Sequence, residues 1–483
     1  MTGLRYKTVK GVIWTSMESG GQFLIQFIIT IVLARLLSPQ DFGVIAMLVI
    51  FTELSKVIID SGYSQALIRK KDADQRDFSS IFYLNILIAI IIYFLFFSIS
   101  PWIADFYHYS ELKNIARVVF VSFVINSLGI VPNAIIVRNL NFKILAKRTL
   151  LSSILSGIFG IILAYHGFGV WSLVFQTLMA SLLRVILIWN YSKWKPSGSI
   201  SYQPIKSMFG FSGNLMISGV LDVIVSNIQS LIIGKYYTKN DLGYYSQAKR
   251  LQTIPSYSIV TVIQTVIYPI LSRIQDENER LRNSYRKVIS VAVLFVFPLM
   301  FLFIGISDNL FYVVLSKKWM PAVAYFRPLC LMGALYPMYS INLNIFKVKG
   351  RSDLFLRVEI IKRIITFTLV IITSTVSVLA LVWGQVIATL LNTIITMVYS
   401  GQLIEYKMKI QFLDLARIAL ISVTTGMIAY EIGRLMHNEP RLFQLLIQLV
   451  GSGVFFIIVL IIFDSHKINL LKEVVSEISN KNS

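Results

Sequence analysis

The sequence is poor in charged residues and in cysteine. Charged residues make up 14% of its 483 positions, whereas soluble domains carry about 25%, and the mean hydropathy is +0.71. The chain is therefore too apolar for a soluble globular protein. A single cysteine, Cys330, excludes an intramolecular disulfide, and its apolar surroundings favour a packed thiol over a reactive one.

Several kinds of chemical site are also missing from the sequence. The four histidines have no metal-ligand spacing, so we expect no metal site and no cofactor. No Gly-x4-Gly-Lys-Ser/Thr loop is present to hold nucleotide phosphates, so ATP is not expected as the direct energy source. The connections between apolar runs are short, so we expect no extramembrane domain, no catalytic residues and no enzyme activity.

Apolar runs of about 20 residues recur along the whole chain, as bilayer-spanning helices require. They predict an all-α integral membrane protein with about fourteen transmembrane helices. The expected spans are 12–33, 43–62, 79–104, 114–137, 149–165, 169–190, 208–233, 242–270, 288–313, 322–346, 358–376, 378–400, 414–434 and 442–463.

The net charge of +21 lies mostly in short connections between these spans. Alternate connections hold 28 Lys and Arg on one side and 7 on the other. Such a bias is typical of membrane topology, so we expect no nucleic-acid partner. It predicts that both termini lie in the cytoplasm.

Residues 33–46 and 233–246 carry the same pattern, in which a basic residue precedes an acid, an apolar residue and a glycine. The matching residues are Arg35, Asp41, Phe42 and Gly43 in the first copy and Lys235, Asp241, Leu242 and Gly243 in the second. This repeat predicts two six-helix lobes related by a parallel pseudo-two-fold axis, with a cavity between them. We expect an N-lobe at 1–200, a C-lobe at 201–410, two further helices at 411–463 and a cytoplasmic amphipathic tail at 464–483.

Ionisable and polar groups inside the spans are candidate functional residues because burying them in lipid is costly. In the first span Trp14, Glu18, Gln22 and Gln26 recur every four residues, which predicts a polar stripe about 18 Å long. Such a stripe is not expected to face lipid.

The second span places Glu53, Lys56 and Asp60 on one face. One interpretation is a self-neutralising structural cluster. The other is that Lys56 meets an anion while the acids carry a proton.

Further candidates are basic residues in later spans. Lys249 and Arg250 are about two turns from the end of their span, whereas Arg117 and Arg327 are close enough to a surface to snorkel. Arg184 and Lys362 are expected to anchor the topology at the cytoplasmic face. The predicted substrate-binding residues are Lys56, Lys249, Arg250, Arg117, Arg327, Gln22 and Gln26, and the predicted ion-coupling residues are Glu18, Glu53, Asp60 and Asp222.

Three segments together resemble a known family. They are the 33–46 phrase preceded by Gly11-Val12-Ile13-Trp14, the stretch Ser61-Gly62-Tyr63-Ser64-Gln65-Ala66-Leu67-Ile68-Arg69, and the turn Gly169-Val170-Trp171-Ser172-Leu173-Val174. The chain resembles the Wzx-type polysaccharide flippases, in the polysaccharide transporter branch of the multidrug/oligosaccharidyl-lipid/polysaccharide (MOP) exporter superfamily. The resemblance covers essentially the whole chain and extends to exporters of colanic and teichuronic acid.

This resemblance implies a bacterial inner-membrane protein that moves an undecaprenyl-pyrophosphate-linked oligosaccharide to the periplasmic leaflet by alternating access. The resemblance does not say whether transport is coupled to H⁺ or to Na⁺. It also does not say whether the protein works alone or together with the polymerase and glycosyltransferases of its pathway. By analogy with a related lipid II flippase, the last two helices would guide the lipid tail. The alternatives are a MATE-like drug/cation antiporter and, with less support, a membrane polysaccharide polymerase.

Overall fold

The computed structural model describes the backbone of residues 2–70, 72–198 and 201–480, and their side chains except at 2–13, 15–17, 19, 254, 262, 265–270 and 464–480. In this part of the chain fourteen helices are 22 residues or longer. They match the fourteen predicted spans one to one. By length and composition, eleven of them could cross a membrane, which confirms an all-α multi-pass membrane protein.

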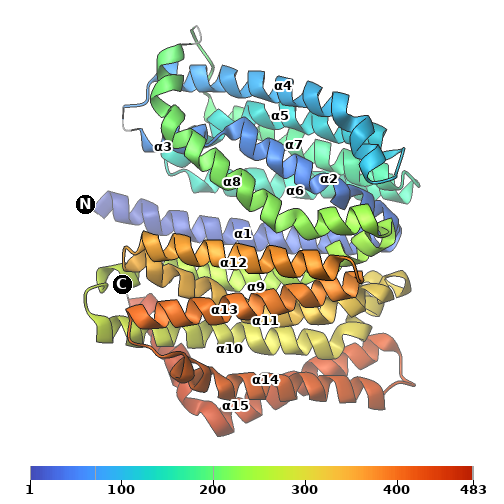
Figure 1. The fold of residues 1–483 in the computed structure, drawn as a ribbon, viewed down its shortest axis with the longest axis vertical. Helices are drawn as coiled ribbons and strands as arrows, with labels where there is room; N and C mark the ends of the chain where they lie inside the picture. The colour runs from blue at the N-terminus through green and yellow to red at the C-terminus, as the bar shows by residue number, and fades with distance from the viewer. Residues whose placement is uncertain (1, 71, 199–200, 481–483) are drawn as a thin grey trace. The chain divides into compact units, whose positions relative to one another are not determined.

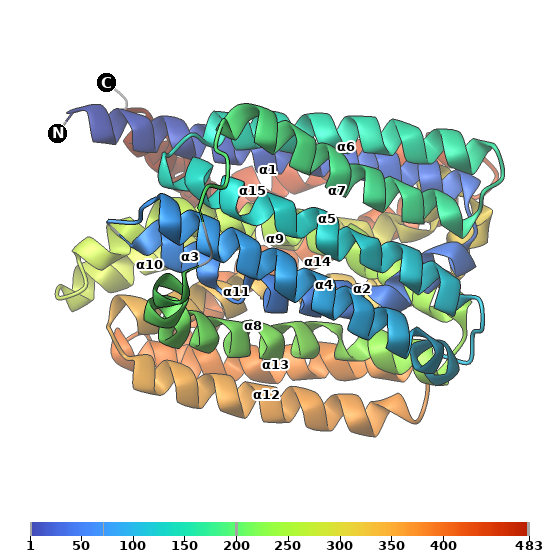
Figure 2. The same ribbon diagram turned by 90° about the horizontal axis from the view of Figure 1, so that it is seen from above.

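The chain divides into two compact units, Met1–Ser246 and Gln247–Ser483. In the first unit α4 packs against α5, and α6 packs against both α1 and α7 (Figures 1 and 2). The helices that begin in this unit are α1 (Thr2–Leu36), α2 (Pro39–Asp60), α3 (Tyr63–Arg69), α4 (Gln75–Phe106), α5 (Leu112–Arg138), α6 (Phe142–Tyr165), α7 (Val170–Ser192), α8 (Tyr202–Tyr236) and α9 (Lys239–Arg273).

In the second unit α10 packs against α14, and α11 against α13. Its helices are α10 (Asn278–Leu310), the π-helix η1 (Phe311–Leu315), the 3-10 helix η2 (Lys317–Ala322), α11 (Val323–Val348), α12 (Ser352–Ser374), α13 (Val378–Leu403), α14 (Met408–Leu435) and α15 (Arg441–Asn480). The units are defined by contacts and not by the repeat, so the division into lobes at residues 200 and 410 stays a prediction.

Many helices are longer than the predicted spans, because polar residues continue the helix past the apolar run. The span predicted at 442–463 is part of α15, which continues to Asn480. The predicted tail is therefore mostly a continuation of this helix, and its place on a membrane surface stays a prediction. Its side chains, like those of Arg5, Lys7 and Lys10, lie outside the described residues.

Both copies of the repeated phrase begin a helix with the same capping box. The backbone N–H of Ser38 donates to Asp41 Oδ2 at 2.8 Å, and the Asp41 N–H donates to Ser38 Oγ at 3.3 Å. Thr238 and Asp241 make the equivalent bonds at 3.2 and 3.1 Å. The acid of the repeat therefore accepts from the amide of the capping residue, and the capping hydroxyl accepts from an amide in the first turn of α2 or α9.

The glycines of the phrase pack against the other copy's backbone. A Cβ atom on Gly43 would lie 2.0 Å from the carbonyl oxygen of Lys239, and one on Gly243 would lie 2.0 Å from that of Pro39. Glycine is needed at both positions because any side chain would overlap a backbone atom. The two copies thus cross in direct contact inside the first unit.

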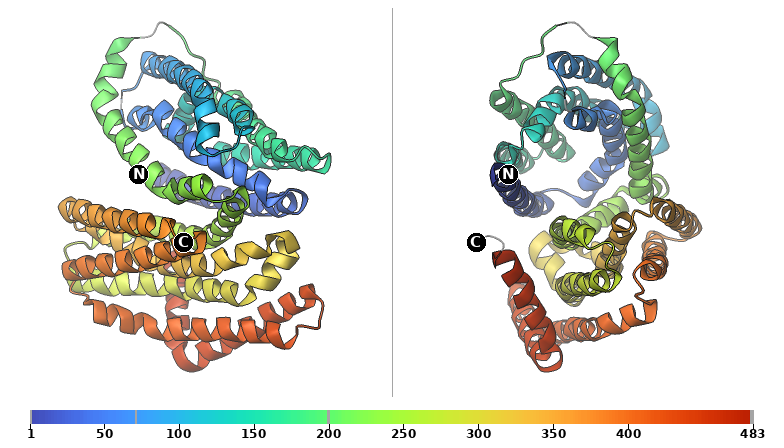
Figure 3. Two further views of the ribbon diagram at one scale, coloured as in Figure 1. Left: turned by 45° about the vertical axis from the view of Figure 1, so that its right-hand side comes forward. Right: turned by 90° about the vertical axis from the view of Figure 1, so that its left-hand side faces the viewer.

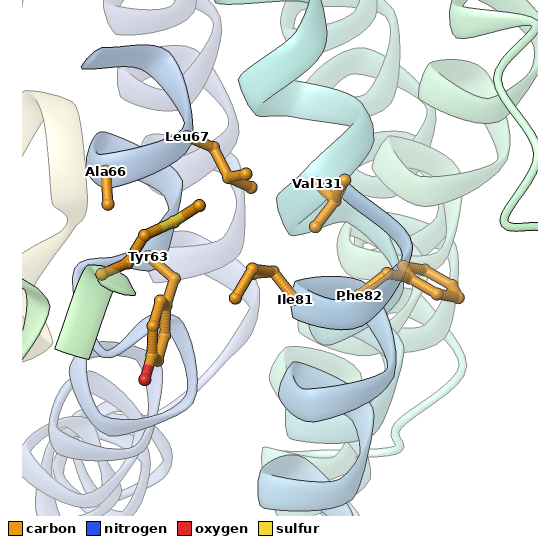
Figure 4. Packing of buried hydrophobic residues seen from close by; sticks show 7 residues of the cluster. Tyr63, Ala66, Leu67, Ile81, Phe82 and Val131 are labelled. Carbon is orange, nitrogen blue, oxygen red and sulfur yellow. The ribbon is translucent and has the colours of Figure 1, made fainter. Parts of the chain in front are cut away.

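The connection between α3 and α4 is fixed by polar contacts and by a small apolar core. The Asp77 N–H donates to Asp74 Oδ1 at 2.8 Å, which lowers the pKa of the Asp74 carboxyl. Lys70 pairs with Asp77 at 2.7 Å. Beside them is a cluster of buried side chains, of which Figure 4 labels Tyr63, Ala66, Leu67, Ile81, Phe82 and Val131.

Buried amides hold α15 to α10 and α14. Asn309 Nδ2 donates to the side-chain oxygens of Gln444 and Gln448 at 3.0 and 2.8 Å, and Gln448 Nε2 donates to the Ala429 carbonyl at 2.7 Å. Interhelical bonds of this kind stabilise membrane bundles. The last two helices lie against one another (Figure 3) and are part of the second unit.

Candidate functional site

Helices α2 and α8 lie side by side and antiparallel, and polar side chains follow their line of contact. Gly219 of α8 lies against Val57 of α2, and Asn227 Nδ2 donates to Glu53 Oε2 at 2.6 Å. Small residues let helices approach closely, and amide–carboxylate bonds join them. Asn227 therefore joins α8 to Glu53 of α2, although Glu53 stays exposed.

The same two helices carry three further predicted residues. Asp60 accepts hydrogen bonds from the backbone N–H and the hydroxyl of Ser64, at 3.1 and 2.7 Å. Lys56 is exposed and interacts electrostatically with Asp60. Asp222 is exposed on α8. The α2–α8 seam, meaning Glu53, Lys56, Asp60, Asp222 and Asn227, thus has three carboxylates and one ammonium group.

A second polar cluster lies between α1, α5, α6 and α7. Thr149 Oγ1 donates to Glu18 Oε1 at 2.7 Å, and Arg148 NH1 donates to Asn133 Oδ1 at 3.0 Å. Arg148 interacts electrostatically with both Glu18 and Arg184. We call Glu18, Asn133, Arg148, Thr149 and Arg184 the arginine cluster.

The rest of the polar stripe on α1 lies on either side of this cluster. Gln22 is half-buried and Gln26 is exposed. Trp14 lies beneath Lys143, whose ammonium nitrogen is 5.5 Å from the ring centroid. The structure therefore brings Glu18 together with Arg148 of α6, which in turn lies near Arg184 of α7. The spacing on α1 alone does not predict this juxtaposition.

The two outer arginines make the same contact in each unit. Arg117 Nε donates to Ser100 Oγ at 2.9 Å, and Arg327 Nε donates to Ser307 Oγ at 2.8 Å. Arg117 also lies 4.0 Å from the centroid of Phe97, and Arg327 pairs with Asp308. Both arginines thus bond to the preceding long helix, and their role in binding substrate stays a prediction.

The second unit pairs its deep cations differently. Lys362 is 3% exposed, forms an ion pair with Glu359 of its own helix, and lies 4.3 Å from the centroid of Tyr339. It was expected at the cytoplasmic face as an anchor, but its ammonium group is packed between helices. Lys249 and Arg250 are half-buried in α9, and their predicted role is untested.

Sequence reasoning missed Arg148 and underrated Arg184. Arg148 belongs to a basic stretch that reads as a connection, but α6 already begins at Phe142. Arg184 was expected as a topology anchor, although it lies eight residues before the end of α7. Its isolation among apolar neighbours was the available signal.

Residues 32–324 match the family described as polysaccharide biosynthesis protein. The teichuronic acid biosynthesis protein TuaB of Bacillus subtilis is 25% identical over 89% of this chain and 90% of its own length. The lipopolysaccharide biosynthesis protein WzxC of Escherichia coli is 21% identical over 81% of this chain and 80% of its own.

Solved structures share the fold. A lipid II flippase, MurJ, in an inward closed conformation superposes with a TM-score of 0.74 at 16% identity, covering 95% of this chain and all of that one. An inward-facing MATE multidrug resistance transporter of the MOP superfamily gives 0.60 at 16% identity, over 80% of this chain and 94% of its own. The chain therefore belongs to the polysaccharide biosynthesis protein family and is a multi-pass membrane protein with the fold of MOP-superfamily transporters.

Proposed function

We propose that the chain is a flippase that moves an undecaprenyl-pyrophosphate-linked oligosaccharide from the cytoplasmic to the periplasmic leaflet by alternating access. The observation that carries the proposal is the family match over residues 32–324, in a chain whose fold is that of membrane transporters. This protein is a transporter and not an enzyme. Two relatives are named for the biosynthesis of teichuronic acid and of lipopolysaccharide, which supports a glycan as the cargo.

The helices described above carry the polar groups that such a protein needs. A pyrophosphate and a glycan cannot enter hydrocarbon without polar partners. The first unit supplies such partners inside apolar helices, in the α2–α8 seam and in the arginine cluster. Lys56 is the seam's one cation, so we propose that it meets the anionic part of the cargo.

We also propose that transport is coupled to H⁺ or Na⁺. Glu18, Glu53, Asp60 and Asp222 are the candidate groups, because each is a carboxylate within a helix of the bundle. The polymerase and glycosyltransferases of the same pathway are proposed partners, since flipping must follow assembly of the unit and precede its polymerisation.

Depletion in cells tests this proposal. Lipid-linked oligosaccharide should accumulate in the cytoplasmic leaflet, where a glycan-cleaving enzyme added to spheroplasts cannot reach it. Expression of the chain should restore cleavage, and expression of K56A at equal protein level should not. Accessibility that is the same with and without the chain would contradict the proposed function.

The alternative of a drug/cation antiporter is favoured by one observation. The α2–α8 seam has an excess of carboxylates, and carboxylates suit organic cations. In everted vesicles an antiporter would dissipate a proton gradient when an organic cation is added, whereas the flippase would not. Cation-dependent dissipation that E53Q abolishes would move the chain to the antiporter class.

A further inference from the structure

Two arginines inside the first unit lie near one another, and one of them also lies near a carboxylate. Arg148 of α6 is near enough to Arg184 of α7 and Glu18 of α1 to interact with both electrostatically. Glu18 is the only acid of α1. The cluster therefore has a formal charge of +1, at a place where a helix bundle ordinarily pairs each charge.

Neutral groups, and not carboxylates, accept the hydrogen bonds of both arginines. Arg148 NH1 donates to the Asn133 amide at 3.0 Å, and Arg184 Nε donates to the Ala180 carbonyl at 3.1 Å. The Glu18 carboxylate accepts from Thr149. Among the described residues, neither arginine has a salt bridge within 4.0 Å.

One arginine atom also lacks a hydrogen-bond partner. Arg148 Nε is buried, and no acceptor for it lies among the described residues. A buried donor without a partner is costly, and more so when it is charged. The guanidinium thus has donor capacity that the protein itself leaves unused.

The second unit shows that this arrangement is not how the chain pairs a buried cation elsewhere. Lys362 forms a direct ion pair with Glu359, three residues earlier on the same helix, and Arg363 lies 4.0 Å from the same carboxylate. The charge of Lys362 is therefore met by a carboxylate in direct contact. Among the described residues neither Arg148 nor Arg184 has such a contact, and Glu18, the carboxylate with which Arg148 interacts, accepts a hydrogen bond from Thr149, so the excess charge of the cluster is available to a ligand.

We propose that Arg148 and Arg184 form an anion site that takes a phosphate-bearing group, and that Glu18 is the carboxylate whose field opposes this anion. Guanidinium groups bind phosphate oxygens through two parallel charge-assisted hydrogen bonds. The identity of the ligand as the pyrophosphate of a lipid-linked cargo rests on the proposed function. The site itself rests only on the charges and contacts of the cluster.

Binding of inorganic pyrophosphate to the full chain in phosphatidylcholine nanodiscs tests the site. Isothermal titration calorimetry should give a dissociation constant that R148Q and R184Q each raise about tenfold or more, because each loses charge-assisted hydrogen bonds. The dissociation constants of R148K and R184K should lie between that of the wild type and those of the glutamine variants. Lysine keeps the positive charge but lacks the planar guanidinium group that makes two parallel hydrogen bonds. E18Q should bind more tightly than the wild type.

Lys147 provides a matched control. It is the neighbour of Arg148 on α6 and is exposed, so K147Q removes the same charge without touching the cluster. Its dissociation constant should equal that of the wild type. Nanodiscs that contain phosphatidylglycerol distinguish the sources of phosphate, because a site for lipid headgroups would be occupied there and would bind pyrophosphate more weakly.

Unchanged binding in R148Q and R184Q, an equal loss in K147Q, or no pyrophosphate binding by the wild type would overturn the site. If the glutamine variants do not fold, E18Q decides, because tighter binding supports the site and unchanged binding contradicts it. Binding without glycan transfer would leave the site and refute the proposed function. If folded R148Q and R184Q bind pyrophosphate as tightly as the wild type while glycan transfer persists, the site is refuted and the proposed function stands.

Discussion

At the scale of single residues, cations inside the helices differ in whether the protein itself satisfies them. Arg117 and Arg327 donate to a serine of the preceding long helix, and Lys362 is paired within its own helix. The two arginine–serine bonds hold neighbouring helices together. Lys56, Arg148 and Arg184 lack a salt bridge to the described residues, which makes them the better candidates for ligand contact.

Replacing Arg117 by lysine should reduce stability and leave transport per folded molecule unchanged. The variant loses the Nε bond to Ser100 and the flat contact with Phe97, which together stabilise the fold by about 1 kcal/mol. Thermal unfolding in detergent measures the loss. N114A, an exposed change one turn earlier, is the control, and lost transport at unchanged stability would instead place Arg117 in the binding site.

The arginine cluster also shows what the sequence can and cannot predict about a site. Glu18 was identified because a lone acid in an apolar span is visible in the sequence. Arg148 was not, because a basic residue near a helix end has the same appearance whether it faces water or the next helix. Only the packing of α1, α6 and α7 brings these groups together.

At the scale of elements, the repeated sequence at 33–46 and 233–246 begins two helices and lets them cross in contact. The capping boxes begin α2 and α9, and the glycines bring the two backbones together. The repeat and its residues could be predicted from the sequence because both copies keep the same spacing. Their mutual contact could not, because a repeat does not say which copies touch.

Alanine at Gly43 or at Gly243 should be destabilising to a similar extent. Each new Cβ would lie 2.0 Å from a backbone oxygen, and overpacking of this kind costs about 1–3 kcal/mol. Gly210 of α8 is the matched control because its Cβ would meet no atom within 4 Å. G210A should therefore unfold at the wild-type temperature or slightly above it, and equal midpoints for G43A and the wild type would refute the close crossing.

At the scale of the whole molecule, the apolar runs predicted the number of long helices, and the Lys and Arg bias predicts their direction. The described residues contain fourteen long helices, of which eleven could cross a membrane, so an all-α multi-pass membrane protein is confirmed. The predicted direction follows from connections with 28 and 7 basic residues. Helix ends were less predictable, because residues at 39–42 and 239–241 continue the helix beyond its apolar part.

Cysteine labelling tests this direction. Cys330 is fully buried, so a membrane-impermeant maleimide should report only introduced thiols. In intact spheroplasts N438C, between α14 and α15, should react, and D276C, between α9 and α10, should react only after lysis. Both positions are exposed, and the reverse pattern would place the termini outside.

Leaflet exposure of an undecaprenyl-pyrophosphate-linked glycan in proteoliposomes tests the central claim most directly. The purified chain should raise the rate at which inner-leaflet glycan becomes accessible to an added enzyme, and an imposed pH or Na⁺ gradient should change that rate. Protein-free liposomes give the baseline. A rate equal to this baseline for several glycans, together with transport of an organic cation, would contradict the flippase account.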